Sequence, residues 1–177
     1  NGITELLIKI KLCFASLYND RAISYRKAMN YDSKVNKLSV CIQKMVRSDL
    51  ASSGVVFTLD ISSGFKDLIV INSSYGLGEM VVSGQVKPDE FLVYKKKMNC
   101  QNIPIIDKIL GFKDVKMVYS DKGTKIVPVD KKKMKVFSLS QEQIIKLAQW
   151  SLLIEQHYSK INNKWCPMDI EWGIDGN

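Results

Sequence analysis

Two carboxylates near the end of the chain have the spacing of a cation site. Asp169 and Glu171 lie two residues apart in residues 168–172, a segment predicted to form a short strand. Side chains two apart in a strand project from the same face, so these carboxylates repel each other unless a cation or base lies between them. Mg²⁺ binds hard oxygen ligands together with phosphate oxygens. The pair is therefore a candidate Mg²⁺ site, and the alternative is an ordinary solvent-facing strand.

A second candidate is the glycine-containing stretch at residues 74–84. It follows an apolar run, residues 68–72, that is predicted to be a buried strand. Gly76 and Gly78 permit backbone angles and close approaches that other residues resist, and Glu79 stands at the exit. A strand, a glycine loop and an acid together are typical of a small-molecule or phosphate site, in which backbone donors and Glu79 face the ligand. The alternative is a tight turn.

A third candidate lies upstream, where residues 38–46 alternate in a pattern that predicts a strand. Backbone groups at the end of such a strand can bind the edge of an adenine, and Met45 can pack on its ring because Met suits irregular contacts. A plain core strand with Met45 as a filler is the alternative.

The elements that must position these residues can be read from periodicity and caps. A helix capped by Thr4 is predicted to run towards Ala28, and residues 55–59 and 68–72 are predicted to form a hairpin. Residues 91–136 read as meandering β structure, with one helical turn at 105–110. Ser140 and Gln143 have the spacing of a capping box, which predicts a long amphipathic helix. His157 lies in its last turn and is expected to have a structural role.

Composition limits the classes of function. The chain has 177 residues, enough for one domain, and no apolar run approaches the roughly 20 residues that span a bilayer. Four cysteines without a CxxC pair, and one histidine, argue against a zinc site and for free thiols in the cytoplasm.

The net charge is +8, with lysine runs at 95–97 and 131–133. We expect solvated loops there, and no nucleic acid or membrane as partner; a basic nucleic-acid module is the alternative.

Three blocks occur in an order that resembles a known domain: residues 43–60, 74–91 and 167–172. They resemble the nucleotide-binding domain of the phosphoenolpyruvate synthase (pyruvate, water dikinase) family, and the similarity extends over residues 15–172. Related domains occur in pyruvate phosphate dikinase and rifampicin phosphotransferase. The resemblance implies an α+β fold of ATP-grasp type, here its C-terminal half: a largely antiparallel sheet with flanking helices. The expected parts are a leading helix (1–29), a β-rich part with the glycine loop (38–136), and a helix with the metal-binding strand (140–172).

The resemblance also implies ligands and partners. It implies binding of Mg²⁺ and ATP, with Glu171 as the first metal ligand and Asp169 as the second. It implies nucleotide contacts from six residues: Gln43, Met45, Val46, Gly76, Gly78 and Glu79. In that family the phosphoryl group passes to a histidine on another domain and then to pyruvate, giving phosphoenolpyruvate, AMP and phosphate. A related phosphotransferase with an antibiotic or glucan acceptor is the alternative.

The family's N-terminal half and the strand expected after Asp175 are not in this sequence. We therefore expect an internal piece of a longer chain, without turnover by itself, whose partners are the histidine and pyruvate-binding domains of that chain. No catalytic residue is assigned, and His157 does not match the phosphorylated histidine. Exposed sheet edges also make a homodimer an expected form.

Overall fold

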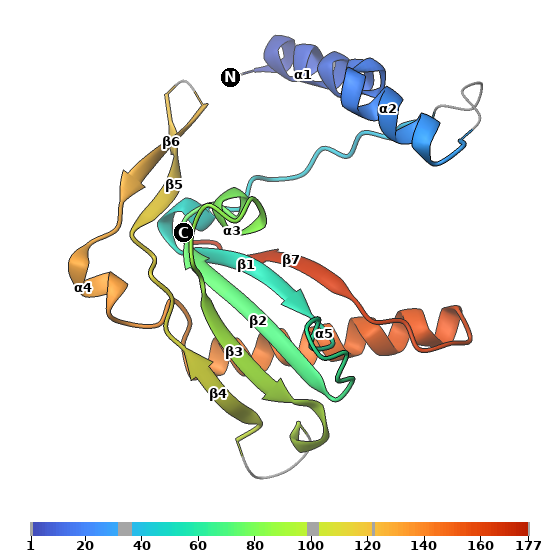
Figure 1. The fold of residues 1–177 in the computed structure, drawn as a ribbon. Helices are drawn as coiled ribbons and strands as arrows, with labels where there is room; N and C mark the ends of the chain where they lie inside the picture. Colours follow the sequence, from blue (N-terminus) through green and yellow to red (C-terminus); the bar gives the residue numbers. More distant parts are fainter. Residues whose placement is uncertain (1, 32–36, 99–102, 122, 177) are drawn as a thin grey trace. The chain divides into compact units, whose positions relative to one another are not determined.

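The computed structural model describes residues 2–31, 37–98, 103–121 and 123–176. The chain divides into two compact units, Asn1–Met45 and Val46–Asn177 (Figure 1).

The first unit begins with two helices rather than one. Helix α1 spans Ile3–Ala15, a 3-10 turn η1 spans Ser16–Tyr18, and helix α2 spans Asp20–Ala28. The predicted extension to Ala28 is confirmed, but the helix breaks at Asn19, whose side chain accepts a hydrogen bond from the Ala22 amide at 2.7 Å. An Asn at this position starts a new helix because its side chain satisfies a free amide. Thr4 is not the cap of α1, because the helix already begins at Ile3.

The strand predicted over residues 38–46 is wrong. Residues 37–47 form neither helix nor strand, and sheet pairing along the chain begins only at Ser52. Alternating side chains do not make a strand by themselves, because the backbone needs a neighbouring strand to complete its hydrogen-bond ladder. Gln43, Met45 and Val46 are exposed.

The second unit contains a five-stranded antiparallel sheet with the order β4-β3-β2-β1-β7 (Figure 1). The predicted hairpin and the largely antiparallel α+β fold are confirmed. The helical turn predicted at 105–110 is wrong, because Ile105 pairs with Val93 in the neighbouring strand. The strands are β1 Ser52–Phe57, β2 Leu68–Tyr75, β3 Asp89–Tyr94, β4 Ile105–Ile109 and β7 Asp169–Gly173.

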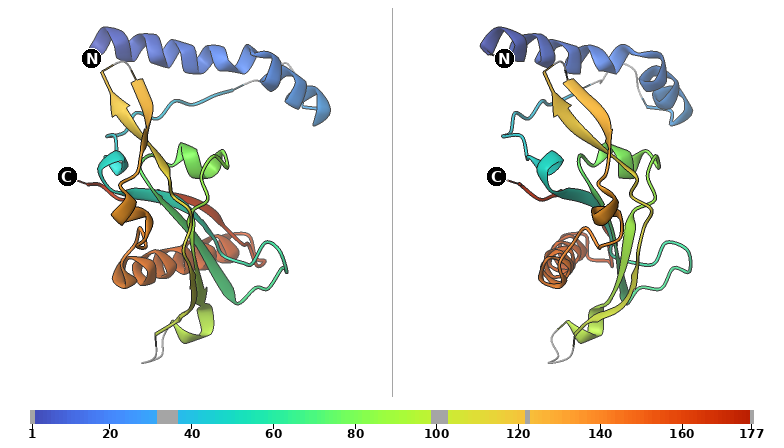
Figure 2. Two further views of the ribbon diagram at one scale, coloured as in Figure 1. Left: turned by 60° about the vertical axis from the view of Figure 1, so that its left-hand side comes forward. Right: turned by 90° about the vertical axis from the view of Figure 1, so that its left-hand side faces the viewer.

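Helix α5, Gln141–Ile161, covers one face of the sheet (Figure 2). The predicted capping box is confirmed: Ser140 Oγ accepts from the Gln143 amide at 3.2 Å, and Gln143 Oε1 accepts from the Ser140 amide at 2.8 Å. Apolar side chains from β1, β2 and β3 pack against the helix to form the main core. Its buried members are Val56, Ile69, Ile71, Phe91, Val93, Leu139, Ile144 and Ala148.

Shorter elements complete this unit. Strands β5 Val115–Ser120 and β6 Gly123–Pro128 form a separate hairpin, in keeping with the β structure predicted for this region. Helix α3, Glu79–Val82, packs on β5 through a small second core of Met80, Val86 and Met117. The remaining turns and helix are η3 Ser48–Leu50, η4 Lys95–Lys97 and α4 Lys131–Met134.

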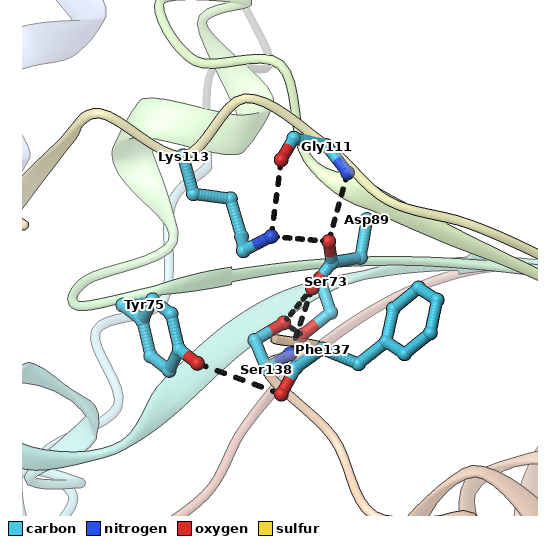
Figure 3. A network of polar contacts seen from close by, with 7 residues as sticks. All are labelled: Ser73, Tyr75, Asp89, Gly111, Lys113, Phe137 and Ser138. Carbon is cyan, nitrogen blue, oxygen red and sulfur yellow. Dashed lines mark hydrogen bonds and ion pairs between the residues drawn. The ribbon is translucent and has the colours of Figure 1, made fainter. Parts of the chain in front are cut away.

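A buried polar network joins β3 to two distant segments (Figure 3). Asp89 and Lys113 are both fully buried and form an ion pair. The other oxygen contacts of Asp89 come from the Gly111 amide at 2.9 Å and from the amide and hydroxyl of Ser138, each at 2.7 Å. Buried charges persist only when they are paired and hydrogen-bonded. The network therefore holds the segment after β4 and the segment before α5 against the start of β3.

Candidate functional site

The face of the sheet opposite α5, hereafter the open face, carries the predicted carboxylates. Residues alternate between the two faces, so Val56 in β1 points to α5 and Val55 points to the open face. Val55 pairs with Glu171 on one side and with Asn72 on the other. Asn72 in turn pairs with Glu90, so one row of side chains crosses four strands of the open face.

Asp169 and Glu171 are both exposed, whereas the intervening Ile170 is partly buried against the α5 core. The predicted strand and the predicted shared face are therefore confirmed. Strand β7 is held beside β1 at its start, where the Met168 amide donates to Thr58 Oγ1 at 2.7 Å and the Thr58 amide donates to the Met168 carbonyl at 3.0 Å.

This carboxylate pair suits a hard cation that brings further oxygen ligands with it. Within the described residues, neither Asp169 nor Glu171 forms a salt bridge. In the same part of the chain, no group of three or more His, Cys, Asp or Glu side chains comes together as a ready metal site. Mg²⁺ is commonly held by one or two carboxylates plus substrate phosphates and waters, so two exposed carboxylates fit it.

The glycine stretch is shaped as predicted at Gly76 but not at Gly78. Gly76 has φ +87°, and a Cβ there would lie 2.6 Å from the Met117 carbonyl oxygen, so only glycine fits. Gly78 has φ −62°, and a Cβ there would meet its nearest neighbour at an ordinary 3.6 Å. A larger residue would therefore fit at Gly78.

The backbone donors at the start of this stretch are used inside the protein. The Gly76 amide donates to the Ala51 carbonyl at 3.2 Å, and the Leu77 amide donates to the Met117 carbonyl at 3.0 Å. The Gly76 carbonyl accepts from buried Ser53 Oγ at 2.6 Å. These bonds tie the end of β2 to β1 and β5, so Gly76 shapes the loop, and its own amide is not free for a phosphate.

Three of the predicted segments meet at one end of the open face. A Cβ on Gly78 would contact Ser53, and Ser53 pairs with Gly173 at the end of β7. A Cβ on Gly173 would in turn lie 3.4 Å from Val46. Glu79, the next residue after Gly78, is exposed at the start of α3. Val46, the glycine stretch and β7 are thus neighbours although they are far apart in the sequence.

The segment that carries Val46 is fixed by an ion pair. The Arg47 guanidinium donates to both oxygens of buried Asp49, at 2.8 and 2.9 Å, and lies 5.7 Å from the centre of the Tyr119 ring. These hydrogen bonds from Arg47 hold the pKa of Asp49 below its usual range. Because bidentate Arg–carboxylate pairs are geometrically specific, the backbone next to Val46 is held in place. Gln43 and Met45 belong to the first unit, where both are exposed.

Two polar residues of the open face were not predicted. A pocket of about 320 Å³ contains Asn72 and Glu90, and its other lining residues are Phe57, Asp60, Ile61, Ser62, Leu68, Val70 and Leu92. Neighbouring strands lie about 4.8 Å apart, so Glu90 is roughly 14 Å from Glu171 and cannot share one ion with it. The sequence offered one sign of this pocket, because Asn72 is a polar residue at the end of an apolar run. Only the strand register shows that Asn72 is aligned with Glu171 and Glu90.

The first lysine run is engaged in structural contacts. Lys95 donates to both oxygens of Glu155 in α5, at 2.9 and 2.7 Å, and Lys96 lies 2.5 Å from Asp67. These pairs hold the end of β3 to its neighbours. None of the helices in the described ranges has the length and apolar character needed to cross a bilayer.

Comparison with known proteins identifies the family of the chain. The family model of the pyruvate phosphate dikinase AMP/ATP-binding domain matches residues 1–177. The chain is 51% identical over 177 residues to phosphoenolpyruvate synthase of Aquifex aeolicus, 49% over 176 residues to that of Deinococcus radiodurans, and 45% over 181 residues to that of Escherichia coli. Each match covers 99% of this chain and 21% or 22% of the relative, so the chain spans about a fifth of these curated relatives. The chain therefore belongs to the family of the pyruvate phosphate dikinase AMP/ATP-binding domain, as its three sequence blocks predicted.

Proposed function

We propose that this chain is the ATP-binding part of a pyruvate, water dikinase. In the proposed reaction, ATP, pyruvate and water give phosphoenolpyruvate, AMP and phosphate, and the phosphoryl group is carried by a histidine on another domain. Support comes from the family membership and from relatives that are named phosphoenolpyruvate synthase. The partners of this chain are then the histidine and pyruvate-binding domains of a longer polypeptide.

The proposal places Mg–ATP on the open face. The observation that carries it is the pair of exposed carboxylates, Asp169 and Glu171, on one face of β7 next to the glycine stretch and Val46. Glu171 would hold Mg²⁺ and Asp169 would assist, with nucleotide phosphates completing the oxygen shell. Bound Mg²⁺ supplies charge neutralisation for phosphoryl transfer, which depends mainly on positioning and electrostatics.

The other predicted residues have separate roles in this proposal. Glu79 and Val46 border the nucleotide at the Gly173 end of the sheet. For Gln43 and Met45, which belong to the first unit, contacts with the adenine and ribose are proposed from the resemblance to the family alone. Gly76 contributes the shape of the loop, since its amide is bonded to Ala51. Gly78 contributes backbone next to Glu79.

The cytoplasm is the proposed location. Three cysteines, Cys13, Cys41 and Cys166, are free thiols, which persist in a reducing compartment.

An antibiotic or glucan acceptor is distinguished by assay of the longer polypeptide: AMP release must depend on pyruvate if pyruvate is the acceptor.

Calorimetric titration with Mg–ATP tests the site. The folded chain is titrated with ATP in Mg²⁺ and in EDTA, alongside Glu171→Gln and the matched control Glu90→Gln, which changes the same group three strands away. We expect Mg²⁺-dependent binding that Glu171→Gln weakens at least about tenfold, because a charged ligand contact contributes roughly 1.5–3 kcal/mol. Glu90→Gln should change the affinity less than about twofold. Equal losses in both variants would contradict the assignment of Glu171. No binding by a folded chain would mean that the other half of the nucleotide-binding domain supplies most of the affinity.

A further inference from the structure

A second pocket lies away from the carboxylate pair, between α4 and the segment that follows β4. It has a volume of about 540 Å³. Its lining contains three apolar side chains, Leu110, Phe112 and Met134, and three lysines, Lys87, Lys131 and Lys135, hereafter the rim lysines. It is at the β4 side of the sheet, whereas β7 forms the opposite edge (Figure 1).

The walls of this pocket are held by the protein itself. Gly111, which also lines the pocket, donates its amide to Asp89 at 2.9 Å and accepts from Lys113 at 3.1 Å (Figure 3). A Cβ on Gly111 would lie 2.2 Å from the Pro88 backbone, so the two segments are in direct contact and leave no room for a side chain at this position. On the other wall, Asp130 caps α4 by accepting from the Lys132 amide at 2.7 Å. Because the walls are already held in place, binding of a ligand costs little conformational entropy in this pocket.

The lining of the pocket is partly apolar and partly cationic. Phe112 is 64% exposed and Leu110 is 43% exposed, so large apolar side chains face water. In the part of the chain that the structure describes, none of the three rim lysines forms a salt bridge, and the lining contains no carboxylate. An occupant with an apolar group flanked by negative charges would satisfy both features.

The lining favours a polypeptide over other anions. Single-stranded nucleic acid is bound on several aromatic side chains, and this pocket has one, Phe112. Small polar ligands are oriented by convergent hydrogen-bonding groups, and the side chains here offer only ammonium groups. An apolar centre with a charged rim is the usual anatomy of a protein interface.

We propose that this pocket is a docking site for an acidic polypeptide segment that inserts one large apolar side chain, flanked by carboxylates. The apolar side chain contacts Leu110, Phe112 and Met134, and the carboxylates pair with Lys87, Lys131 and Lys135. The site is separate from the proposed nucleotide site, so binding of Mg–ATP and of the segment should not require one another.

The probe is a fluorescein-labelled peptide, acetylated and amidated, with one Phe between pairs of Asp and Glu. Binding to the folded chain is measured by fluorescence anisotropy at about 0.15 M salt, where charges beyond about 8 Å are screened. A peptide with Ser in place of Phe keeps the charge and removes the apolar group. We expect the Phe peptide to bind at least tenfold more tightly than the Ser peptide.

Matched variants of the chain complete the test. Lys131→Glu with Lys135→Glu reverses two rim charges and should weaken binding at least tenfold. Lys132→Glu with Lys133→Glu makes the same charge change on the same helix outside the lining, and should weaken it less than threefold. Phe112→Ser, at an exposed position, should reduce binding without lowering the free energy of unfolding. The proposal would be overturned if both double variants lost the same affinity or if the two peptides bound equally well. It would also be overturned if the folded chain bound no peptide, or if a mixed oligonucleotide bound more tightly at this pocket.

Discussion

The two faces of the five-stranded sheet are made by the same strands and differ in burial along β3 and β7. On the face that α5 covers, Val56, Ile71 and Phe91 are fully buried. On the open face, one residue away along each strand, Glu90 is partly buried and Glu171 is exposed. In β3 and β7 the strand period of two thus separates residues that stabilise the fold from more exposed residues, whereas β2 is buried on both faces.

The difference in free energy between the faces follows from burial. Each large apolar side chain that is fully buried contributes about 1.5–3 kcal/mol, whereas surface substitutions usually change stability by less than about 0.5 kcal/mol. The covered face should therefore control unfolding, and the open face should control binding. Four sets of substitutions test this division.

The largest effect is expected for Phe91→Ala on the covered face. Phe91 is fully buried and packs against Phe137 in a tilted arrangement with the ring centres 5.4 Å apart, so truncation leaves a cavity in the core. Such changes cost about 3–5 kcal/mol of unfolding free energy, measurable by urea denaturation. Leu92→Ala is the control, because Leu92 lies next to it on the open face and is only partly buried. Equal losses would show that the two faces do not differ as proposed.

Asp89→Asn should be nearly as damaging. The change leaves the Lys113 ammonium buried without a counter-charge, and breaking a buried ion pair in this way costs about 3–5 kcal/mol. Adding Lys113→Met removes that charge, so the double variant should be more stable than Asp89→Asn alone. A double variant as unstable as the sum of its single changes would mean that the pair is not coupled, which a double-mutant cycle measures directly.

Ser140→Ala should have an intermediate effect. The substitution removes the side-chain half of the α5 capping box and should lower the unfolding free energy by about 1 kcal/mol. Gln149→Ala changes an exposed residue of the same helix and should have little effect. A thermal melt of both variants distinguishes loss of the cap from a general weakening of the helix.

The smallest effect on stability is expected at the carboxylates. Glu171→Gln and Asp169→Asn alter exposed side chains without salt bridges in the described residues, so the unfolding free energy should stay within about 0.5 kcal/mol. Denaturation of these variants beside the Mg–ATP titration gives the comparison. A large loss of stability would indicate that the open face also supports the fold.

Local signals in the sequence predicted several of these features correctly. The capping box at Ser140 and Gln143 and the shared face of Asp169 and Glu171 each depend on a few adjacent residues. Predictions that needed a distant partner were less accurate. Residues 38–46 alternate as a strand but lack strand pairing, and Ile105–Ile109 became a strand because β3 lies beside it.

By itself, the sequence determined the family through three blocks of resemblance, which also implied the α+β class. It determined the α5 cap and the carboxylate spacing through short local motifs. Only the tertiary structure decided that the Gly76 amide is bonded to Ala51, that Val46 and Gly78 meet around Ser53 and Gly173, and that Asn72 and Glu90 share a row with Glu171. The physical reason is that strand register and hydrogen-bond partners are set by which segments pack together. No local pattern of side chains specifies which distant segments become neighbours.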